Sequence, residues 1–185
     1  RRSRISLSKN QEPTQKSHSP TGLTNYKMKI AVVYSSVTGN TKELAELIYR
    51  NLMGRSVDVY IYRIEDFPLE LLSIFDAIAI GTYSWGDGEI PKEMWKLYQG
   101  LEELDNKDLV TAVFGTGDSF YPNYCGAVDL FRDMLYVHTT LAATLKVELL
   151  PQIQDFHRSQ MFVDSIMKKA DPIAYHSGLK SINYK

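Results

Sequence analysis

The stretch Ser35-Ser36-Val37-Thr38-Gly39-Asn40-Thr41 follows an apolar run, residues 30–34, and precedes a helical pattern that begins near Lys42. A strand that leads into a helix in this way presents the free backbone N–H groups of the helix N-terminus, with the positive end of the helix dipole behind them. Three hydroxyl groups at Ser36, Thr38 and Thr41 add donors, and Gly39 removes a side chain that would block a ligand. The stretch therefore predicts a phosphate-binding turn.

The composition of this turn excludes two common phosphate sites. A nucleoside triphosphate site needs G-x-x-x-x-G-K-[ST], and both the leading glycine and the lysine are missing. A dinucleotide site needs G-x-G-x-x-G, and only one glycine is present. A single terminal phosphate held by neutral donors fits the turn. The alternative that this stretch leaves open is an ordinary Ser/Thr-rich turn capped by Thr41.

The whole chain has the composition of one globular domain. It has 185 residues, of which 44% are hydrophobic, a length and composition that suit a single core. Its longest apolar run, residues 30–34, is far shorter than a membrane span requires. The single cysteine, Cys125, excludes an internal disulfide and fits a reducing compartment, and the four histidines show no metal-ligand spacing.

The charge of the chain is divided unequally along its length. Residues 1–28 contain six basic residues and one acidic residue, so the rest of the chain carries a net charge of −6 although the whole carries −1. Residues 1–27 are polar and have almost no large aliphatic side chains, which predicts a disordered extension. We expect a folded domain over 28–170 and a C-terminal tail over 171–185.

Apolar runs alternate with helical patterns from residue 28 onward, which is typical of βαβ units and a parallel sheet. The predicted strands are 29–34, 57–63, 76–82, 109–115 and a strand within 144–150. The predicted helices are 41–53, which Gly54 ends, 68–74, one that Pro91 opens at its first position, 126–141, and 155–169.

Two loops that follow predicted strands are rich in aromatic residues. The first is Thr82-Tyr83-Ser84-Trp85-Gly86-Asp87-Gly88-Glu89, and the second runs from Thr116 to Gly126. In doubly wound sheets, ligands lie outside the carboxyl ends of the strands, so these loops and the phosphate turn should converge. Trp85 has polar and glycine neighbours, which favours a ligand contact over a core position. Tyr121, ahead of Pro122, is the most exposed candidate in the second loop.

Three motifs in order give the chain a specific resemblance. Ser36-Val37-Thr38-Gly39-Asn40-Thr41, Trp85-Gly86-Asp87, and Gly117-Asp118-Ser119-Phe120-Tyr121 with Cys125-Gly126-Ala127-Val128-Asp129 resemble the bacterial flavodoxins of the short-chain group. The resemblance covers about residues 28–169. It implies an α/β, flavodoxin-like, doubly wound parallel sheet of five strands in the order 2-1-3-4-5, with helices on both faces. It also implies one non-covalently bound FMN.

Carried over by position, the resemblance assigns roles around FMN. It places Ser36, Thr38, Asn40 and Thr41 on the phosphate and ribityl chain, Trp85 and Tyr121 on the two faces of the ring, and Gly86 at flavin N5. Asp118 and the backbone near Cys125 meet the pyrimidine edge. The full expected FMN-binding set is Ser35, Ser36, Val37, Thr38, Gly39, Asn40, Thr41, Thr82, Tyr83, Ser84, Trp85, Gly86, Asp87, Thr116, Gly117, Asp118, Tyr121, Tyr124 and Cys125. No catalytic residue and no metal ligand is expected.

The resemblance implies a cytoplasmic, monomeric, low-potential carrier of single electrons, whose FMN cycles between semiquinone and hydroquinone. Redox partner proteins, reductases and acceptor oxidoreductases, would dock at the flavin edge, with no nucleic acid or membrane involved. Acidic residues such as Asp87, Glu89 and Glu93 form a solvated face or, as a group, steer a basic partner.

Two other functions remain as alternatives. The first is an FMN-dependent NAD(P)H:quinone reductase of related fold, which would need open space above the flavin ring. The second is a structural or regulatory module that has lost FMN. Trp85 and Tyr121, as covering aromatics, argue against the first, and the intact phosphate turn argues against the second.

Overall fold

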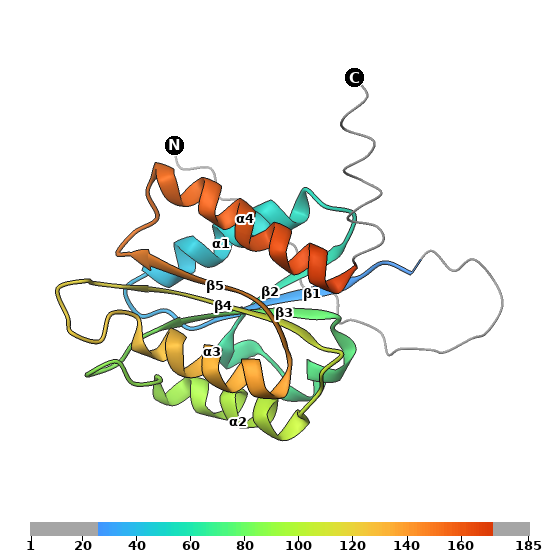
Figure 1. Ribbon diagram of the computed structural model, residues 1–185, viewed down its shortest axis with the longest axis horizontal. Helices are drawn as coiled ribbons and strands as arrows, with labels where there is room; N and C mark the ends of the chain where they lie inside the picture. The colour runs from blue at the N-terminus through green and yellow to red at the C-terminus, as the bar shows by residue number, and fades with distance from the viewer. Residues whose placement is uncertain (1–25, 172–185) are drawn as a thin grey trace.

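A computed structural model describes residues 26–171. Five parallel strands form one sheet in the order β2-β1-β3-β4-β5, which confirms the predicted fold class (Figure 1). The strands are β1 (Lys29–Tyr34), β2 (Asp58–Arg63), β3 (Ala77–Tyr83), β4 (Val110–Gly117) and β5 (Thr140–Glu148). The chain order reverses between β1 and β3, and the two strands pair in parallel there, with Ile30 opposite Ala77 and Tyr34 opposite Gly81.

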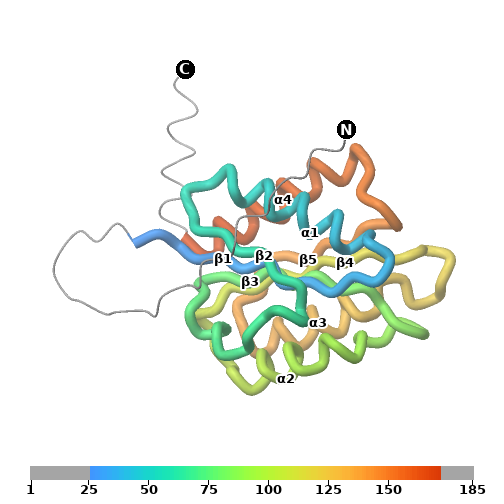
Figure 2. The backbone as a smooth tube through the Cα atoms, turned by 180° about the vertical axis from the view of Figure 1, so that it is seen from behind, coloured from blue at the N-terminus to red at the C-terminus, as the bar shows by residue number. Residues whose placement is uncertain are grey.

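Helices cover both faces of the sheet. The α-helices are α1 (Asn40–Met53), α2 (Trp95–Leu104), α3 (Gly126–His138) and α4 (Ile153–Ala170), and short 3-10 helices lie at η1 (Ile64–Asp66), η2 (Leu69–Ile74) and η3 (Lys92–Met94). The views from the front and from behind both place α1 and α4 on one face and α2 and α3 on the other (Figures 1 and 2). The fold is therefore a three-layer sandwich with a core on each side of the sheet.

The central strands are buried on both faces, which explains why they are apolar runs without alternation. In β1, Ala31 and Val33 pack into the core beneath α2 and α3. Ile30 and Val32 pack into the opposite core, beneath α1 and α4. Because side chains point to alternate faces of a strand, one short stretch of sequence supplies both cores.

The boundary between α3 and β5 differs from the prediction. The helix ends at His138 and the strand begins at Thr140, whereas the sequence predicted a helix over 126–141 and a strand within 144–150. Thr139 adopts an extended conformation at the helix end. Its hydroxyl donates to Leu135 O at 2.7 Å and lies 2.6 Å from Thr111 Oγ1 in the interior. These contacts end the helix early, and no local pattern in the sequence reveals them.

Three predicted helix ends or segments lie where expected but differ in local conformation. Pro91 precedes η3 in an extended conformation, with ψ 143°, and α2 begins only at Trp95. Gly54 ends α1 as predicted, and it does so with φ −71° and not in the left-handed conformation common for glycine at this position. The predicted helix over 68–74 is the 3-10 helix η2. In each case the position was right and the local conformation was different.

Residues just before β1 contact the domain. The Tyr26 hydroxyl donates to the Asp76 carboxylate, at 2.6 Å from Oδ1, and Lys27 Nζ lies 2.6 Å from Asp58 Oδ1. Most of the expected extension, residues 1–25, and nearly all of the expected tail, residues 172–185, lie outside the described residues. Within residues 26–171, no helix is long and apolar enough to cross a membrane.

Candidate cofactor site

A cleft of about 360 Å³ opens where the loops after β1, β3, β4 and β5 meet. Twelve of the residues expected from the sequence line it, namely Thr38, Asn40, Tyr83, Ser84, Gly86, Asp87, Thr116, Gly117, Asp118, Tyr121, Tyr124 and Cys125. Gly88, Asn123 and Leu149 line it as well, and the sequence did not single them out. The convergence of these loops is the one predicted for a doubly wound sheet.

The turn after β1 leaves the N-terminus of α1 open. Gly39 is the N-cap residue, has φ 97°, and no side chain caps the helix. The Gly39 amide donates to Ser36 Oγ at 3.2 Å, and the Glu43 amide donates to Gly39 O at 3.0 Å. No atom lies within 4 Å of a Cβ built on Gly39. The first amides of α1 therefore have no side-chain cap, the space beside Gly39 is open, and the positive end of the helix dipole lies there, which fits an anionic group such as a phosphate.

The hydroxyl groups of this turn do not all face the same way. Thr38 is exposed and lines the cleft. Thr41 is buried, and its hydroxyl lies 2.8 Å from that of Thr116 at the end of β4. Ser36 accepts from Gly39, and Ser35 donates to Glu93 Oε1 at 2.5 Å. The sequence predicted that Ser36, Thr38 and Thr41 all donate to a phosphate; of the three, Thr38 lines the cleft, Ser36 Oγ accepts from a backbone amide and Thr41 pairs with Thr116. Val37, also expected here, is exposed and lies outside the cleft lining.

The loop after β3 is a tight turn closed by Trp85 and Glu89. The Trp85 amide donates to Glu89 O at 2.9 Å, and the Glu89 amide donates to Trp85 O at 2.7 Å. Gly86 and Gly88 have φ 51° and φ 94°, in the left-handed region that favours glycine. Trp85 is 62% exposed, which excludes the core position, although its side chain is not part of the cleft lining.

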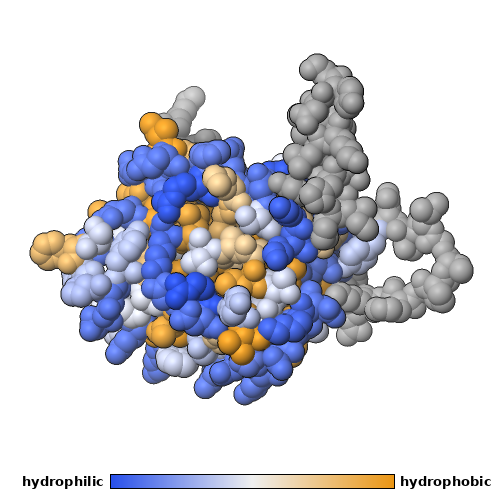
Figure 3. Space-filling model, in the orientation of Figure 1, coloured by the Kyte–Doolittle hydropathy of each residue, from blue (hydrophilic) through white to orange (hydrophobic). Residues whose placement is uncertain are grey.

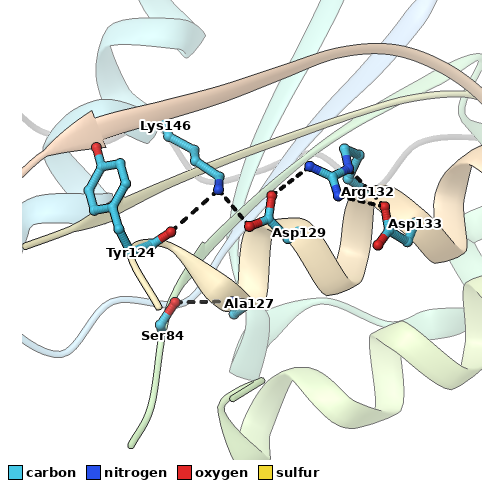
Figure 4. Close-up of polar contacts among 7 residues, drawn as sticks. All are labelled: Ser84, Tyr124, Ala127, Asp129, Arg132, Asp133 and Lys146. Atoms are coloured by element: carbon cyan, nitrogen blue, oxygen red, sulfur yellow. Dashed lines mark hydrogen bonds and ion pairs between the residues drawn. The ribbon is translucent and has the colours of Figure 1, made fainter. Parts of the chain in front are cut away.

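This turn is fastened to the loop that follows β4. Asn123 Nδ2 donates to Asp87 O at 3.0 Å and to Asp87 Oδ1 at 2.9 Å. A Cβ on Gly88 would lie 2.7 Å from Asn123 Cβ, so the two loops are in close contact. Nearby, Ser84 Oγ accepts from the Ala127 amide at 3.1 Å, at the start of α3 (Figure 4). These contacts fix the loop after β3 and the loop after β4, which form two walls of the cleft, relative to each other.

The loop after β4 projects two aromatic side chains outward. Asp118 Oδ1 accepts from the Phe120 amide at 2.9 Å, and Asp118 O accepts from the Tyr121 amide at 3.1 Å, so the chain turns sharply here. Phe120 is 90% exposed and Tyr121 is 63% exposed. The space-filling view shows hydrophobic atoms at the end of the molecule where this loop extends, at the left of Figures 1 and 3. The expectation that Tyr121 lies outside the core is confirmed.

The base of the same loop is held from β5. Lys146 Nζ donates to Tyr124 O at 3.3 Å and to Asp129 Oδ2 at 2.6 Å (Figure 4). Cys125 is buried and has φ 53°. Burial raises the pKa of its thiol to about 11, so the neutral thiol is the form present near neutral pH. Lys146 was not predicted, because nothing in the sequence near residue 146 marks it as part of a site.

Glu93, like Lys146, was not predicted from the sequence to be part of the site. Its Oε1 accepts from Ser35 Oγ and, at 3.0 Å, from the Tyr83 hydroxyl. Burial acts to raise the pKa of this carboxyl, but the hydrogen bonds outweigh burial and the pKa is lowered. Burial and the bond to Glu93 raise the pKa of Tyr83 to about 12. Glu93 therefore links the end of β3 to the residue after β1. It is not simply one of the solvated acidic residues on the surface.

Thr82, the last of the expected residues, lies beneath the site. It is fully buried in β3, and its hydroxyl donates to Tyr83 O at 2.8 Å. The structure therefore gathers most of the predicted set around one cleft, and places Ser35, Thr41 and Thr82 in a supporting layer below it.

Comparisons with known proteins agree with this geometry. A family model described as flavodoxin matches residues 32–138. The probable flavodoxin 1 of Bacillus subtilis is 34% identical over 146 residues, which cover 77% of this chain and 92% of the relative. Crystalline oxidised flavodoxin 2 of Bacillus cereus is 35% identical, with a TM-score of 0.71 over 76% of this chain and 99% of that one. A short-chain flavodoxin associated with a bacterial microcompartment is 27% identical, with a TM-score of 0.74 over 78% and 99%.

Proposed function

The chain belongs to the flavodoxin family, in the bacterial short-chain group, and we propose that its cleft holds FMN with the phosphate at the turn after β1. FMN is the cofactor of this family, and the protein is a low-potential electron carrier and not an enzyme. Family membership thus sets aside both alternatives, the quinone reductase and the module without FMN. FMN supplies the redox chemistry, and the protein binds and orients it.

The observation that carries the proposed placement is the open N-terminus of α1. No side chain caps its first amides and the space at Gly39 is open, beside a cleft where the other predicted loops converge. A phosphate dianion placed there gains charge-assisted hydrogen bonds from the amides and from the exposed Thr38 hydroxyl. No lysine or arginine is needed, because the helix dipole provides the positive potential.

The flavin ring then extends between the loops after β3 and β4. Tyr121 lines the cleft and Trp85 stands exposed beside it, so each can cover one face of the ring. Gly86, Asp118 and the backbone at Cys125 lie along the cleft between them. We assign Gly86 to flavin N5 and Asp118 with Cys125 to the pyrimidine edge, as the resemblance implies.

The finer proposal is that FMN cycles between semiquinone and hydroquinone. The left-handed conformation of Gly86 supports it, since a glycine lets the Gly86–Asp87 peptide rotate without the penalty that a Cβ brings. A rotated peptide would direct its carbonyl to a protonated N5. This hydrogen bond would favour the one-electron reduced state and separate the two reduction steps.

Flavodoxins donate electrons to redox partner proteins. We propose that these partners dock on the rim of the cleft, with the protein as a cytoplasmic monomer. Phe120, Tyr121 and Trp85 are exposed there. The acidic residues Asp87 and Glu89 lie in the exposed turn after β3. Exposed aromatic side chains supply contact area at interfaces, and negative charges steer a basic partner.

The proposed placement is tested with FMN and riboflavin, followed by the fluorescence of each on titration with protein. Tight binding of FMN and much weaker binding of riboflavin support a site in which the phosphate carries the affinity. Equal affinity for both would overturn the assignment of the turn after β1. Stepwise reduction monitored in the visible range tests the finer proposal, because a blue species at one electron indicates the neutral semiquinone.

A further inference from the structure

Lys146 reaches from β5 to the junction between the loop after β4 and α3. Its ammonium contacts the Tyr124 carbonyl, the Asp129 carboxylate in the first turn of α3, and the face of the Tyr124 ring, whose centre is 5.9 Å from Nζ (Figure 4). The Lys146 side chain is 27% exposed, so the charge is partly withdrawn from water. One cation thus holds the backbone, the aromatic ring and the helix start together.

The hydrogen bond to Tyr124 O fixes the direction of the next amide. The described residues contain no cis peptide, so the Cys125 N–H points away from the Tyr124 carbonyl and hence away from Lys146. A Cβ built on Gly117 would lie 3.1 Å from Cys125 N, and both residues line the cleft. Among residues 26–171, none accepts a hydrogen bond from this N–H. The amide is therefore held at the border of the cleft as a free donor.

Cys125 adopts a conformation that needs outside support. Its φ of 53° lies in the left-handed region, which residues with a Cβ rarely occupy and which persists only when neighbouring contacts impose it. Lys146 provides one such contact through the preceding carbonyl. Its charge is also felt at this position, because it lowers the pKa of the Cys125 thiol, whereas burial, Asp129 and Glu148 raise that pKa.

Asp129 links Lys146 to a second cation. Its Oδ2 accepts from Lys146, and its Oδ1 accepts from Arg132 at 2.7 Å. Arg132 in turn pairs with Asp133 at 2.7 Å (Figure 4). The four side chains carry two positive and two negative charges, and Lys146 is the member that contacts the peptide preceding Cys125, so its removal alone would leave an excess negative charge behind this wall of the cleft.

We propose that Lys146 is a positioning residue of the FMN site. It directs the Cys125 N–H toward the flavin, and its charge favours the fully reduced, anionic flavin over the uncharged oxidised form. This inference rests on the proposed placement of the pyrimidine edge at Cys125. It adds a role from β5, a strand that the predicted site did not include.

The test compares Lys146→Met with Lys146→Arg by FMN titration and by potentiometry of both reduction steps. Loss of one charge-assisted hydrogen bond to the positioned peptide should weaken binding of oxidised FMN about tenfold in Lys146→Met. The fully reduced, anionic form should be weakened at least threefold more than the uncharged one-electron form, which lowers the potential of the second step by about 28 mV at 59 mV per decade for one electron. Lys146→Arg keeps the charge and should restore most of that potential.

A matched control exists at the other end of α3. Lys107 Nζ donates to the Tyr136 carbonyl at 3.4 Å and to the Val137 carbonyl, so Lys107→Met removes the same charge and a similar tether. The two ends of this 13-residue helix are about 18 Å apart at 1.5 Å per residue, beyond the screening length at physiological salt. Lys107→Met should leave both potentials and the FMN affinity unchanged.

Asp129→Asn is a second variant that tests the same proposal if Lys146→Met does not fold. Removal of the negative charge should raise the potential of the second step, the opposite sign to Lys146→Met. A parent protein that binds FMN and variants that leave this potential unchanged would overturn the role of Lys146 and leave the proposed function intact. A parent protein that does not bind FMN would overturn the proposed function itself.

Discussion

The Ser35 hydroxyl donates to Glu93 Oε1 at 2.5 Å, across a sequence separation of 58 residues. The same oxygen accepts from the Tyr83 hydroxyl, so one carboxylate joins the first residue of the phosphate turn to the last residue of β3. Ser35 is buried and Glu93 is partly buried. This link sets the phosphate turn and the loop after β3 at a fixed distance from each other before any ligand binds.

Glu93→Gln should therefore weaken the contact between the two loops and lower the stability of the fold. Hydrogen bonds to charged groups contribute about 1.5–3 kcal/mol each, and partial exposure reduces that, so the free energy of unfolding should fall by about 1–2 kcal/mol. Urea denaturation of the protein without FMN measures the change. Glu102→Gln, at an exposed position of α2, is the control and should stay within about 0.5 kcal/mol of the parent. Equal losses in both variants would show that the link contributes nothing.

The contribution of Glu93 should depend on pH with a defined sign. Its pKa is lowered in the folded protein, so the unfolded chain takes up the proton first as pH falls. The stabilisation is fully present above the ordinary glutamate pKa of about 4.3 and is lost as pH falls through the lower folded value. Urea midpoints of the parent and Glu93→Gln should accordingly converge below pH 4. A gap that stays constant down to pH 3 would contradict the assignment.

Substitutions at Thr38 and Thr41 should have different effects, the first on FMN affinity and the second on stability. Thr38→Ala removes an exposed hydroxyl at the cleft, and we expect FMN affinity to fall about tenfold with little change in stability. Thr41→Val leaves the buried Thr116 hydroxyl without its partner, which should cost about 1–3 kcal/mol of unfolding free energy. FMN titration and urea denaturation of both variants check this. A stable Thr41→Val variant would mean that the buried hydroxyl pair is dispensable.

Gly86→Ala should affect the redox steps more than the fold. A Cβ there would meet only the Glu89 carboxylate, with Oε2 at 3.4 Å, so space is available, but φ 51° makes a residue with a Cβ unfavourable by about 1–2 kcal/mol. We expect FMN to remain bound, the first potential to fall and the blue semiquinone at mid-titration to decrease. Gly88→Ala is the structural comparison, because its Cβ would clash with Asn123 and should mainly lower stability. Full semiquinone yield in Gly86→Ala would assign N5 to another group.

Two deletions test the boundary of the folded domain. We propose that removal of residues 1–25 leaves the melting temperature and the FMN content unchanged. Removal of residues 1–27 also deletes the Tyr26 bond to Asp76 and the Lys27 pair with Asp58, which should cost about 1 kcal/mol for such exposed contacts. Differential scanning calorimetry of both proteins checks this. Identical melting temperatures would place the boundary after Lys27, as the sequence suggested.

The sequence by itself determined the strand and helix alternation, the parallel sheet and the phosphate turn. These features are encoded locally: buried parallel strands such as 29–34 are continuous apolar runs, and a strand, a glycine-containing polar turn and a helix follow one another directly. The positions of Trp85 and Tyr121 outside the core were also readable, because their neighbours are polar. Local patterns of this kind need no knowledge of what packs against them.

Only the tertiary structure decided which side chains support the site. Glu93, Asn123 and Lys146 become partners of residues 10 to 58 positions away; the nearest pair is Tyr83 with Glu93 and the farthest is Ser35 with Glu93. The end of α3 at His138 likewise depends on the contact between Thr139 and Thr111. Such contacts arise from strand order and register, which bring the carboxyl ends of separate strands to one edge. Their residues carry no local signal, because an isolated lysine or glutamate has the same pattern on a solvated surface.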